Sequence, residues 1–424
     1  MVNTRITRTA IVGLLAMTAI HVLLFWTLRE QVRNGYSDFA SFYGAGRILH
    51  SGLHNKIYDY RTQWDLQRSF APKVVIRHGP LLYNHAPFEA WLFALFGGLP
   101  YPVAFVLWNV VNLAMLAAVA WLMRTYVPGG FGFALLLAFA FFPVFLVFVQ
   151  GQDSILLLLV YTLALRSLRS GHEFAAGILL GLGLFKLHLV LPLVLIFVFR
   201  AQIRVLAGFG VSAVAMFFAS IAAAGWHDTL NYPRYVWSLS QQHAIGAITP
   251  VNMPNLRGLL ESLLPSHGRL IVPGLSAVIA VLFVYLAARA WTRMDRRRGV
   301  SAGAVTDLGF SAAVITTVLV SYHLYAYDAT LLLLPMIVMS GLVFADGHLR
   351  PATRKLTTCA VGLLLFTPLW AVLLFRARHL NTMALLVLLF GWVVLKAASE
   401  ASGSGDSNAT PPVLMKASAD GLSS

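Results

Sequence analysis

Residues 101–123 read YPVAFVLWNVVNLAMLAAVAWLM, a long run without a charged side chain. A helix rises about 1.5 Å per residue, so a run of this length covers the roughly 30 Å hydrocarbon core of a bilayer. Comparable apolar runs recur along most of the chain. The sequence therefore predicts an all-α, polytopic membrane protein in which the spans pack as a helical bundle.

The composition agrees with a membrane location. Hydrophobic residues make up 58% of the 424 residues and charged residues only 11%, whereas about a quarter of the residues in soluble domains are charged. The net charge of +15 is explained by Lys and Arg in cytoplasmic loops, as at residues 293–298. We expect no nucleic-acid partner. The single cysteine, Cys359, excludes an intramolecular disulfide and a cysteine-based metal site.

Basic residues also predict the orientation of the chain. Arg5 and Arg8 precede the first span and place the N-terminus in the cytoplasm. If residues 85–98 dip into the membrane without crossing it, an alternating path of about twelve spans keeps the remaining basic clusters cytoplasmic. After the first span, at about 11–28, the predicted spans are 101–123, 131–149, 153–168, 173–184, 187–199, 203–224, 271–291, 305–322, 329–344, 355–375 and 380–396.

The polar segments divide the chain further. Residues 29–84 form a predicted external loop with two amphipathic helices, at about 39–49 and 62–70, that lie on the membrane interface. Residues 1–398 are predicted to form one membrane domain, and the tail 399–424, rich in Ser, Ala, Gly and Pro, a disordered cytoplasmic segment. The sequence shows no internal repeat, which disfavours secondary transporters built from duplicated halves.

Asp38 begins the polar external loop, about ten residues beyond the first span. A carboxylate at the mouth of a helical bundle is costly to desolvate. Asp38 either caps a helix that begins near Phe39 or accepts a proton from an attacking hydroxyl group as a catalytic base.

Lys186 and His188 interrupt an apolar stretch that runs from Gly181 to Pro192. A cation inside a membrane segment is a functional candidate by default, and its natural partner is an anion. Lysine offers phosphate a point charge, and histidine adds a directional donor. We therefore predict that both bind phosphate. The alternative is a structural ion pair between Lys186 and Asp153 or Asp328.

Two more polar segments lie at span boundaries. Gln150 and Gln152 flank a glycine, and their amides either hydrogen-bond sugar hydroxyls or form an ordinary turn. His323 and Asp328 stand among three tyrosines of a kind common at membrane interfaces. The His–Asp pair either binds phosphate and positions a sugar, or forms a polar helix cap.

Several nucleotide and metal motifs are missing from the sequence. It has no phosphate-binding loop with its lysine, no dinucleotide-binding glycine pattern and no His-Glu-x-x-His. An ATP-driven pump and a zinc protease of that kind are therefore disfavoured. No soluble segment is long enough for a nucleotide-sugar-binding domain.

Taken together, the chain resembles membrane glycosyltransferases of the GT-C class, and within it glycosyltransferase family 87, over roughly residues 10–396. Five short motifs carry this resemblance. They are Asp38-Phe-x-x-Phe-Tyr43-x-Ala-Gly46, Tyr58-Asp59, Tyr83-Asn-His85-Ala-Pro87-Phe88, Gln150-Gly-Gln152 with Gly181-Leu-Gly-Leu-Phe-Lys186, and His323 with Tyr327-Asp328. His85 departs from the family's usual Tyr or Pro, and the Ser-Pro that many members show before His323 is missing.

The resemblance implies an inverting hexosyltransferase that takes a sugar, with mannose as the first candidate, from a polyprenyl phosphate. It implies Asp38 as the base, and Lys186 and His323, with His188, as donor-phosphate ligands. Tyr43, His85, Gln150, Gln152 and Asp328 are the candidates for sugar and acceptor binding. The acceptor is a lipid or a glycan. We expect no cofactor and no metal requirement, and a site on the periplasmic face of a bacterial plasma membrane.

Two other classes of function remain open. A transporter or lipid flippase would use Asp38, Lys186 and Asp328 to line a substrate or proton path, although the polar groups gather at one face instead of mid-membrane. A scaffold or assembly factor without catalysis would tolerate exchange of Asp38.

Overall fold

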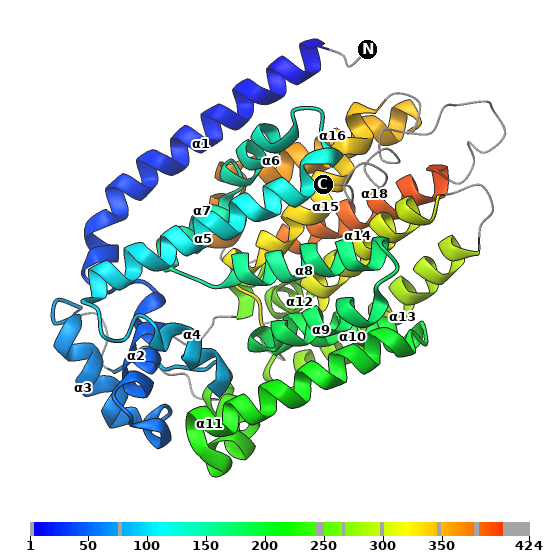
Figure 1. The fold of residues 1–424 in the computed structure, drawn as a ribbon. Helices are drawn as coiled ribbons and strands as arrows, with labels where there is room; N and C mark the ends of the chain where they lie inside the picture. Colours follow the sequence, from blue (N-terminus) through cyan, green and yellow to red (C-terminus); the bar gives the residue numbers. More distant parts are fainter. Residues whose placement is uncertain are drawn as a thin grey trace, which may run out of the picture.

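The computed structural model describes residues 4–74, 79–241, 250–264, 268–296, 301–345, 349–376 and 381–401. Within these ranges every regular element is a helix, which confirms the predicted all-α membrane bundle. The long helices lie side by side, and the shorter α2, α3 and α4 gather at one end of the bundle (Figure 1).

The helices follow one another with short connections. The α-helices are α1 (Thr4–Arg33), α2 (Phe39–His50), α3 (Tyr60–Phe70), α4 (Ala90–Ala94), α5 (Tyr101–Met123), α6 (Gly130–Phe139), α7 (Phe142–Gln150), α8 (Ser154–Arg169), α9 (Glu173–Leu182), α10 (Leu187–Phe199), α11 (Ile203–Gln241), α12 (Leu256–Leu263), α13 (Gly268–Asp295), α14 (Ala302–Val320), α15 (Leu333–Phe344), α16 (Pro351–Leu365), α17 (Thr367–Trp370) and α18 (Met383–Ala401). Tighter helical turns are η1 (His54–Lys56), η2 (Pro87–Glu89), η3 (Arg124–Tyr126), η4 (Gly183–Lys186), η5 (Pro250–Asn252) and η6 (Ala326–Leu332), and η7 (Ala371–Arg376) is a π-helix.

Among the described residues, eight helical segments are long and apolar enough to cross a membrane, or ten if two bent helix pairs each form one span. The predicted number was about twelve. The difference arises because α8 has only 16 residues and because residues 173–199 count once by length. Residues 85–98, whose crossing the sequence left open, hold only the short η2 and α4, which are too short to cross.

Residues 173–199 form a helical hairpin. Gly177 on α9 packs against the backbone of Val205, near the start of α11. Gly181, about one turn further along α9, packs against Ser212, about two turns further along α11. The helices α9 and α11 are therefore parallel. At the other end of α10, Arg200 pairs with Asp295, at the end of α13. The chain thus turns at η4, which brings Lys186 to the tip of the hairpin.

The external region agrees with the prediction in its helices but not in its surroundings. Helices α2 and α3 lie where amphipathic helices were expected. Ten of the twelve residues of α2 are buried, so this helix lies inside the protein and not on the membrane interface. Gly46 lies against the backbone of Phe93, where a Cβ atom would clash, and this close approach joins α2 to α4.

The C-terminal helix α18 extends to Ala401, slightly past the predicted start of the tail. Residues 402–424, which hold the rest of the predicted disordered tail, lie outside the described part of the chain.

Candidate active site

Asp38 stands between α1 and α2, at the end of the bundle where α2, α3 and α4 gather (Figure 1). Its side chain does not cap α2. Instead its Oδ2 accepts a hydrogen bond from Gln152 Nε2 at 2.8 Å, and its backbone N–H donates to Gln150 Oε1 at 3.0 Å. These hydrogen bonds hold the carboxylate in one orientation. It is only half-buried and is therefore accessible. This geometry favours the base over the helix cap.

The turn between α7 and α8 is what presents the two glutamines. Gly151 has φ = +61°, and a Cβ atom there would lie 2.7 Å from the Cβ of Phe39, so glycine is required on both counts. Trp108 Nε1 donates to the Gly151 carbonyl at 2.9 Å, and Asn112 Nδ2 donates to the Gln152 carbonyl at 3.1 Å. The turn is thereby fixed to α5, and its amide side chains reach Asp38.

Lys186 is 2% exposed and pairs with two carboxylates. Its Nζ lies 2.8 Å from Asp153 Oδ1 and 2.6 Å from Asp328 Oδ1. It also donates to Ser154 Oγ at 3.1 Å. The structure thus shows both of the ion pairs that the sequence offered as alternatives. An ammonium group held between two carboxylates has little charge left for a phosphate.

His188 and His323 face each other across the same end of the bundle, with ring centroids 5.9 Å apart. Burial lowers the pKa of His323 to about 3, so its ring is neutral at physiological pH and offers one N–H donor. Tyr325 stacks edge-on against His323 at 5.6 Å. Burial first, and then the charge of Asp38, raise the pKa of Tyr325.

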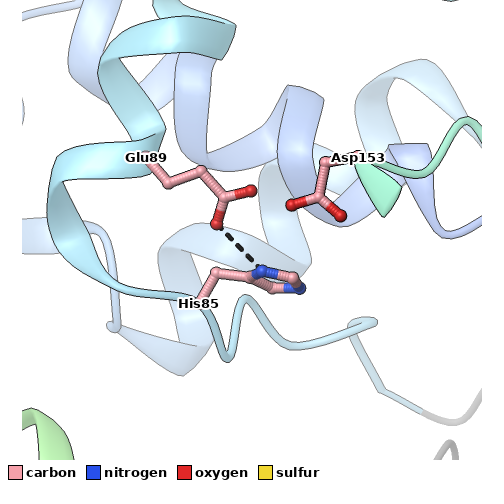
Figure 2. A group of neighbouring side chains, drawn as sticks. All are labelled: His85, Glu89 and Asp153. Atoms are coloured by element: carbon pink, nitrogen blue, oxygen red, sulfur yellow. Dashed lines mark ion pairs between the residues drawn. The ribbon is translucent and has the colours of Figure 1, made fainter. Parts of the chain in front are cut away.

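His85, Glu89 and Asp153 form a cluster from two distant parts of the chain (Figure 2). His85 Nδ1 lies 2.9 Å from Glu89 Oε2, and the exposed fractions of the two side chains are 17% and 2%. Asp153 is fully buried. One potential ligand atom from each of the three residues lies within 4.8 Å of the other two.

The charges of this cluster depend on burial. Burial lowers the pKa of His85 to about 4. Burial, and then the charge of Asp153, raise the pKa of Glu89 well above its usual range. Burial acts in the same direction on Asp153, but the charge of Lys186 outweighs it and lowers the pKa of that carboxyl group. Burial therefore favours the uncharged forms of His85 and Glu89, whereas Lys186 favours the ionised form of Asp153.

Several buried polar atoms near Asp38 have no hydrogen-bond partner within the described residues. They are Gln152 Oε1, Asp153 Oδ2, Glu89 Oε1 and His188 Nε2. Native proteins satisfy most buried polar groups, so a concentration of unsatisfied atoms at one place indicates that a ligand completes them.

Comparison with family models gives one match, to the model of glycosyltransferase family 87, over residues 83–321. This range is more than half of the chain. The chain belongs to glycosyltransferase family 87. No curated protein and no solved structure matches it. The chain is therefore a multi-pass membrane glycosyltransferase.

The matched range of this glycosyltransferase contains Glu89, Gln152 and Lys186 but begins after Asp38 and ends just before His323. The hydrogen bond from Gln152 to Asp38 and the ion pair from Lys186 to Asp328 connect the matched core to these flanking residues. The two sets of contacts meet at neighbouring residues, because Gln152 bonds Asp38 and the next residue, Asp153, pairs with Lys186.

Tyr43 lies one helical turn past Asp38 in the glycosyltransferase, and it is fully buried. Its hydroxyl donates to the Leu99 carbonyl at 2.6 Å and accepts from Arg47 at 3.1 Å. Its ring packs against Phe70 and Tyr101. These contacts favour a packing role, and sugar binding by Tyr43 stays a prediction.

Sequence reasoning missed Glu89 and treated Asp153 only as a partner of Lys186. A signal for Glu89 was present, because it is the only carboxylate in residues 85–98 and stands four residues after His85. On a helical turn that spacing brings two side chains together.

An apolar cavity of about 670 Å³ lies between α1, α6, α15 and α16. It is lined by residues such as Gly13, Phe133 and Ser340 and by none of the candidate site residues. It is therefore separate from the network around Asp38.

Proposed function

We propose that this glycosyltransferase transfers a hexose, mannose in the first place, from a polyprenyl-phosphate sugar to a lipid or glycan acceptor, with inversion at the anomeric carbon. The observation that carries the proposal is the half-buried Asp38 carboxylate, oriented by Gln152 beside a buried network of charged and unsatisfied groups.

The two ends of the bundle support a site on the non-cytoplasmic face. Asp38, Gln152 and Lys186 lie at one end. Arg169 and Arg200 lie at the other, where they pair with Asp307 and Asp295. Since basic residues mark the cytoplasmic side, Asp38 faces outward, toward the periplasm in a bacterial plasma membrane.

In the proposed reaction an acceptor hydroxyl attacks the anomeric carbon from the side opposite the phosphate. Asp38 takes the hydroxyl proton as the new C–O bond forms and the bond to the phosphate oxygen breaks. The polyprenyl phosphate leaves with one more negative charge. General base catalysis of this kind is worth about 10²–10⁴-fold in rate, and holding the two reactants in line contributes further.

Charge developing on the leaving phosphate needs donors that are already in place. His188 and His323 are the candidates for direct contact, since their rings face each other and His188 Nε2 has no hydrogen-bond partner in the described chain. Lys186 contributes through its field and by fixing Asp153 and Asp328. Gln150, Gln152 and His85 remain the candidates for binding sugar or acceptor hydroxyls.

The test uses purified full-length protein with radiolabelled polyprenyl-phosphate mannose or glucose and a lipid extract as the source of acceptor. We expect label from mannose to enter a new product with inverted anomeric configuration. The Asp38→Asn variant keeps the hydrogen bond from Gln152 but cannot accept the proton, so we expect transfer to fall about 10²–10⁴-fold. The exposed Asp65→Asn variant on α3 serves as the control.

Turnover retained by Asp38→Asn would exclude Asp38 as the base. Movement of the intact donor across the membrane without a new glycosidic bond would favour a flippase.

A further inference from the structure

The charges at the outer end of the bundle do not balance. Two buried carboxyl groups, Asp153 and Asp328, pair with the ammonium group of Lys186. A third buried carboxyl group, Glu89, lies within 4.8 Å of Asp153. Buried charges are costly unless they are paired. An anionic donor would therefore approach a region whose nearest described cation is already held by two carboxylates.

The excess of negative charge lies at particular carboxylate oxygens of Asp153 and Glu89. Asp153 uses Oδ1 toward Lys186, while its Oδ2 has no hydrogen-bond partner among the described residues. Glu89 uses Oε2 toward His85, while its Oε1 is equally unsatisfied. Figure 2 shows the two carboxylates directed toward each other above the imidazole ring of His85. Two fully buried oxygens thus point into one small space beside a nitrogen ligand.

We propose that His85, Glu89 and Asp153 bind a divalent metal ion. The three side chains supply one imidazole nitrogen and two carboxylate oxygens, and the separations, all within 4.8 Å, fit the ligand-to-ligand distances of an ion with bonds of about 2.0–2.2 Å. The mixed nitrogen and oxygen set suits Mn²⁺ or Zn²⁺ better than Ca²⁺, which prefers oxygen alone.

A divalent ion also corrects the charge. With Glu89 ionised, the three carboxylates carry three negative charges, which equal the one positive charge of Lys186 and the two of the ion. Asp328 and Ser154 keep Lys186 in place, so that Asp153 bridges the ammonium group and the metal.

The proposed role of the ion in catalysis rests on the proposed function, whereas the binding of the ion does not. Asp153 directly follows Gln152, which holds Asp38. A cation at this point lies beside the base and within the same network as His188 and His323. It would offset the negative charge that develops on the leaving phosphate.

The competing explanation is a proton shared between Glu89 and Asp153. The Glu89→Gln variant separates the two. A glutamine amide can replace a protonated carboxyl group by donating to Asp153, but it is a poor metal ligand. A shared proton predicts that the variant changes little, and a metal site predicts that it loses binding.

The experiment measures metal binding directly. Purified full-length protein is stripped with a chelator and titrated with Mn²⁺, and free Mn²⁺ is followed by electron paramagnetic resonance. We expect one tight site per chain, at which Zn²⁺ competes. Glu89→Gln should weaken Mn²⁺ binding on the order of tenfold or more, and His85→Gln serves as the second variant should Glu89→Gln not fold. Asp65→Asn, an exposed carboxylate on α3, should bind Mn²⁺ like the unchanged protein.

Two results would overturn the proposal. One is the absence of a stoichiometric Mn²⁺ or Zn²⁺ site in the unchanged protein, and the other is an Mn²⁺ affinity in Glu89→Gln and in His85→Gln that equals the affinity of the unchanged protein. Because no sugar donor is present in the titration, a failure here is distinguishable from a failure of the proposed transfer reaction, which depends on Asp38.

Discussion

Two buried clusters of charge, one at each end of the bundle, differ in how they are satisfied. We call the end proposed to face the cytoplasm the inner end and the Asp38 end the outer end. At the inner end Arg169 Nη1 lies 3.3 Å from Asp307 Oδ2, and the Tyr126 hydroxyl donates to Asp307 Oδ1 at 2.8 Å. One cation meets one carboxylate. At the outer end Lys186 meets two carboxylates, with Glu89 nearby and oxygens left unsatisfied. The balanced cluster joins helices, whereas the unbalanced one has the properties of a ligand site.

The largest expected effect on stability follows from removing Lys186. In Lys186→Met, Asp153 and Asp328 lose their only described cation, and breaking a buried pair in this way costs about 3–5 kcal/mol. The measurement is thermal unfolding in detergent. Arg169→Met at the inner end should cost less, about 1–3 kcal/mol, because Tyr126 still donates to Asp307.

The double variant Lys186→Met/Asp328→Asn checks the cause of that loss. We expect it to recover part of the stability, because one of the unpaired carboxylates has been removed. A double variant less stable than Lys186→Met alone would contradict the charge-based account.

A smaller effect is expected at Gln152. In Gln152→Ala the Asp38 carboxylate loses the hydrogen bond that orients it, and a bond to a charged group is worth about 1.5 kcal/mol, or roughly tenfold in rate. The kcat for transfer should therefore fall. The matched amide Asn109, which donates to the Phe105 carbonyl on its own helix, serves as the control. An equal loss in Asn109→Ala would show that Gln152 has no special link to Asp38.

The smallest expected effect is a pH-dependent change in stability that arises from His323 at the outer end. The pKa of His323 is about 3, lowered by burial first and then by His188, with Asp328 opposing and Arg257 and His85 adding to the shift. The unfolded chain binds this proton near pH 6.5. Stability due to the neutral ring is therefore present above pH 6.5 and is lost as the pH falls toward 3.

This contribution is measured as the change in Tm between pH 7.5 and pH 5. His323→Asn should show a smaller decrease than the unchanged protein. An identical decrease in both proteins would assign the pH dependence to other groups.

The fold was largely predictable from the sequence, because hydropathy and basic clusters are local properties. The predicted end of the span at residue 224 coincides with Gly225, whose φ of +79° interrupts α11. The pair of short segments around Lys186 corresponds to the hairpin of α9 and α10. The interior position of α2 was not predictable, since an amphipathic pattern does not say whether its apolar face meets lipid or protein.

The sequence proposed candidate site residues but could not give their contacts. Asp38 and Gln152 are far apart in the chain, and pairing them requires the tertiary structure. The sequence left open which aspartate pairs with Lys186, and the structure uses both. Glu89 was missed because the motif on which the prediction was based, His85-Ala-Pro87-Phe88, ends one residue before it.

The central claim is that chemistry belongs to the unbalanced outer end and not to the balanced inner pair. The most direct measurement is the initial rate of hexose transfer by Asp38→Asn and Asp307→Asn, prepared and assayed in parallel. We predict that Asp38→Asn loses transfer by two orders of magnitude or more, while folded Asp307→Asn stays within a few-fold of the unchanged protein. Equal rates in the two variants, or a greater loss in Asp307→Asn, would contradict the account.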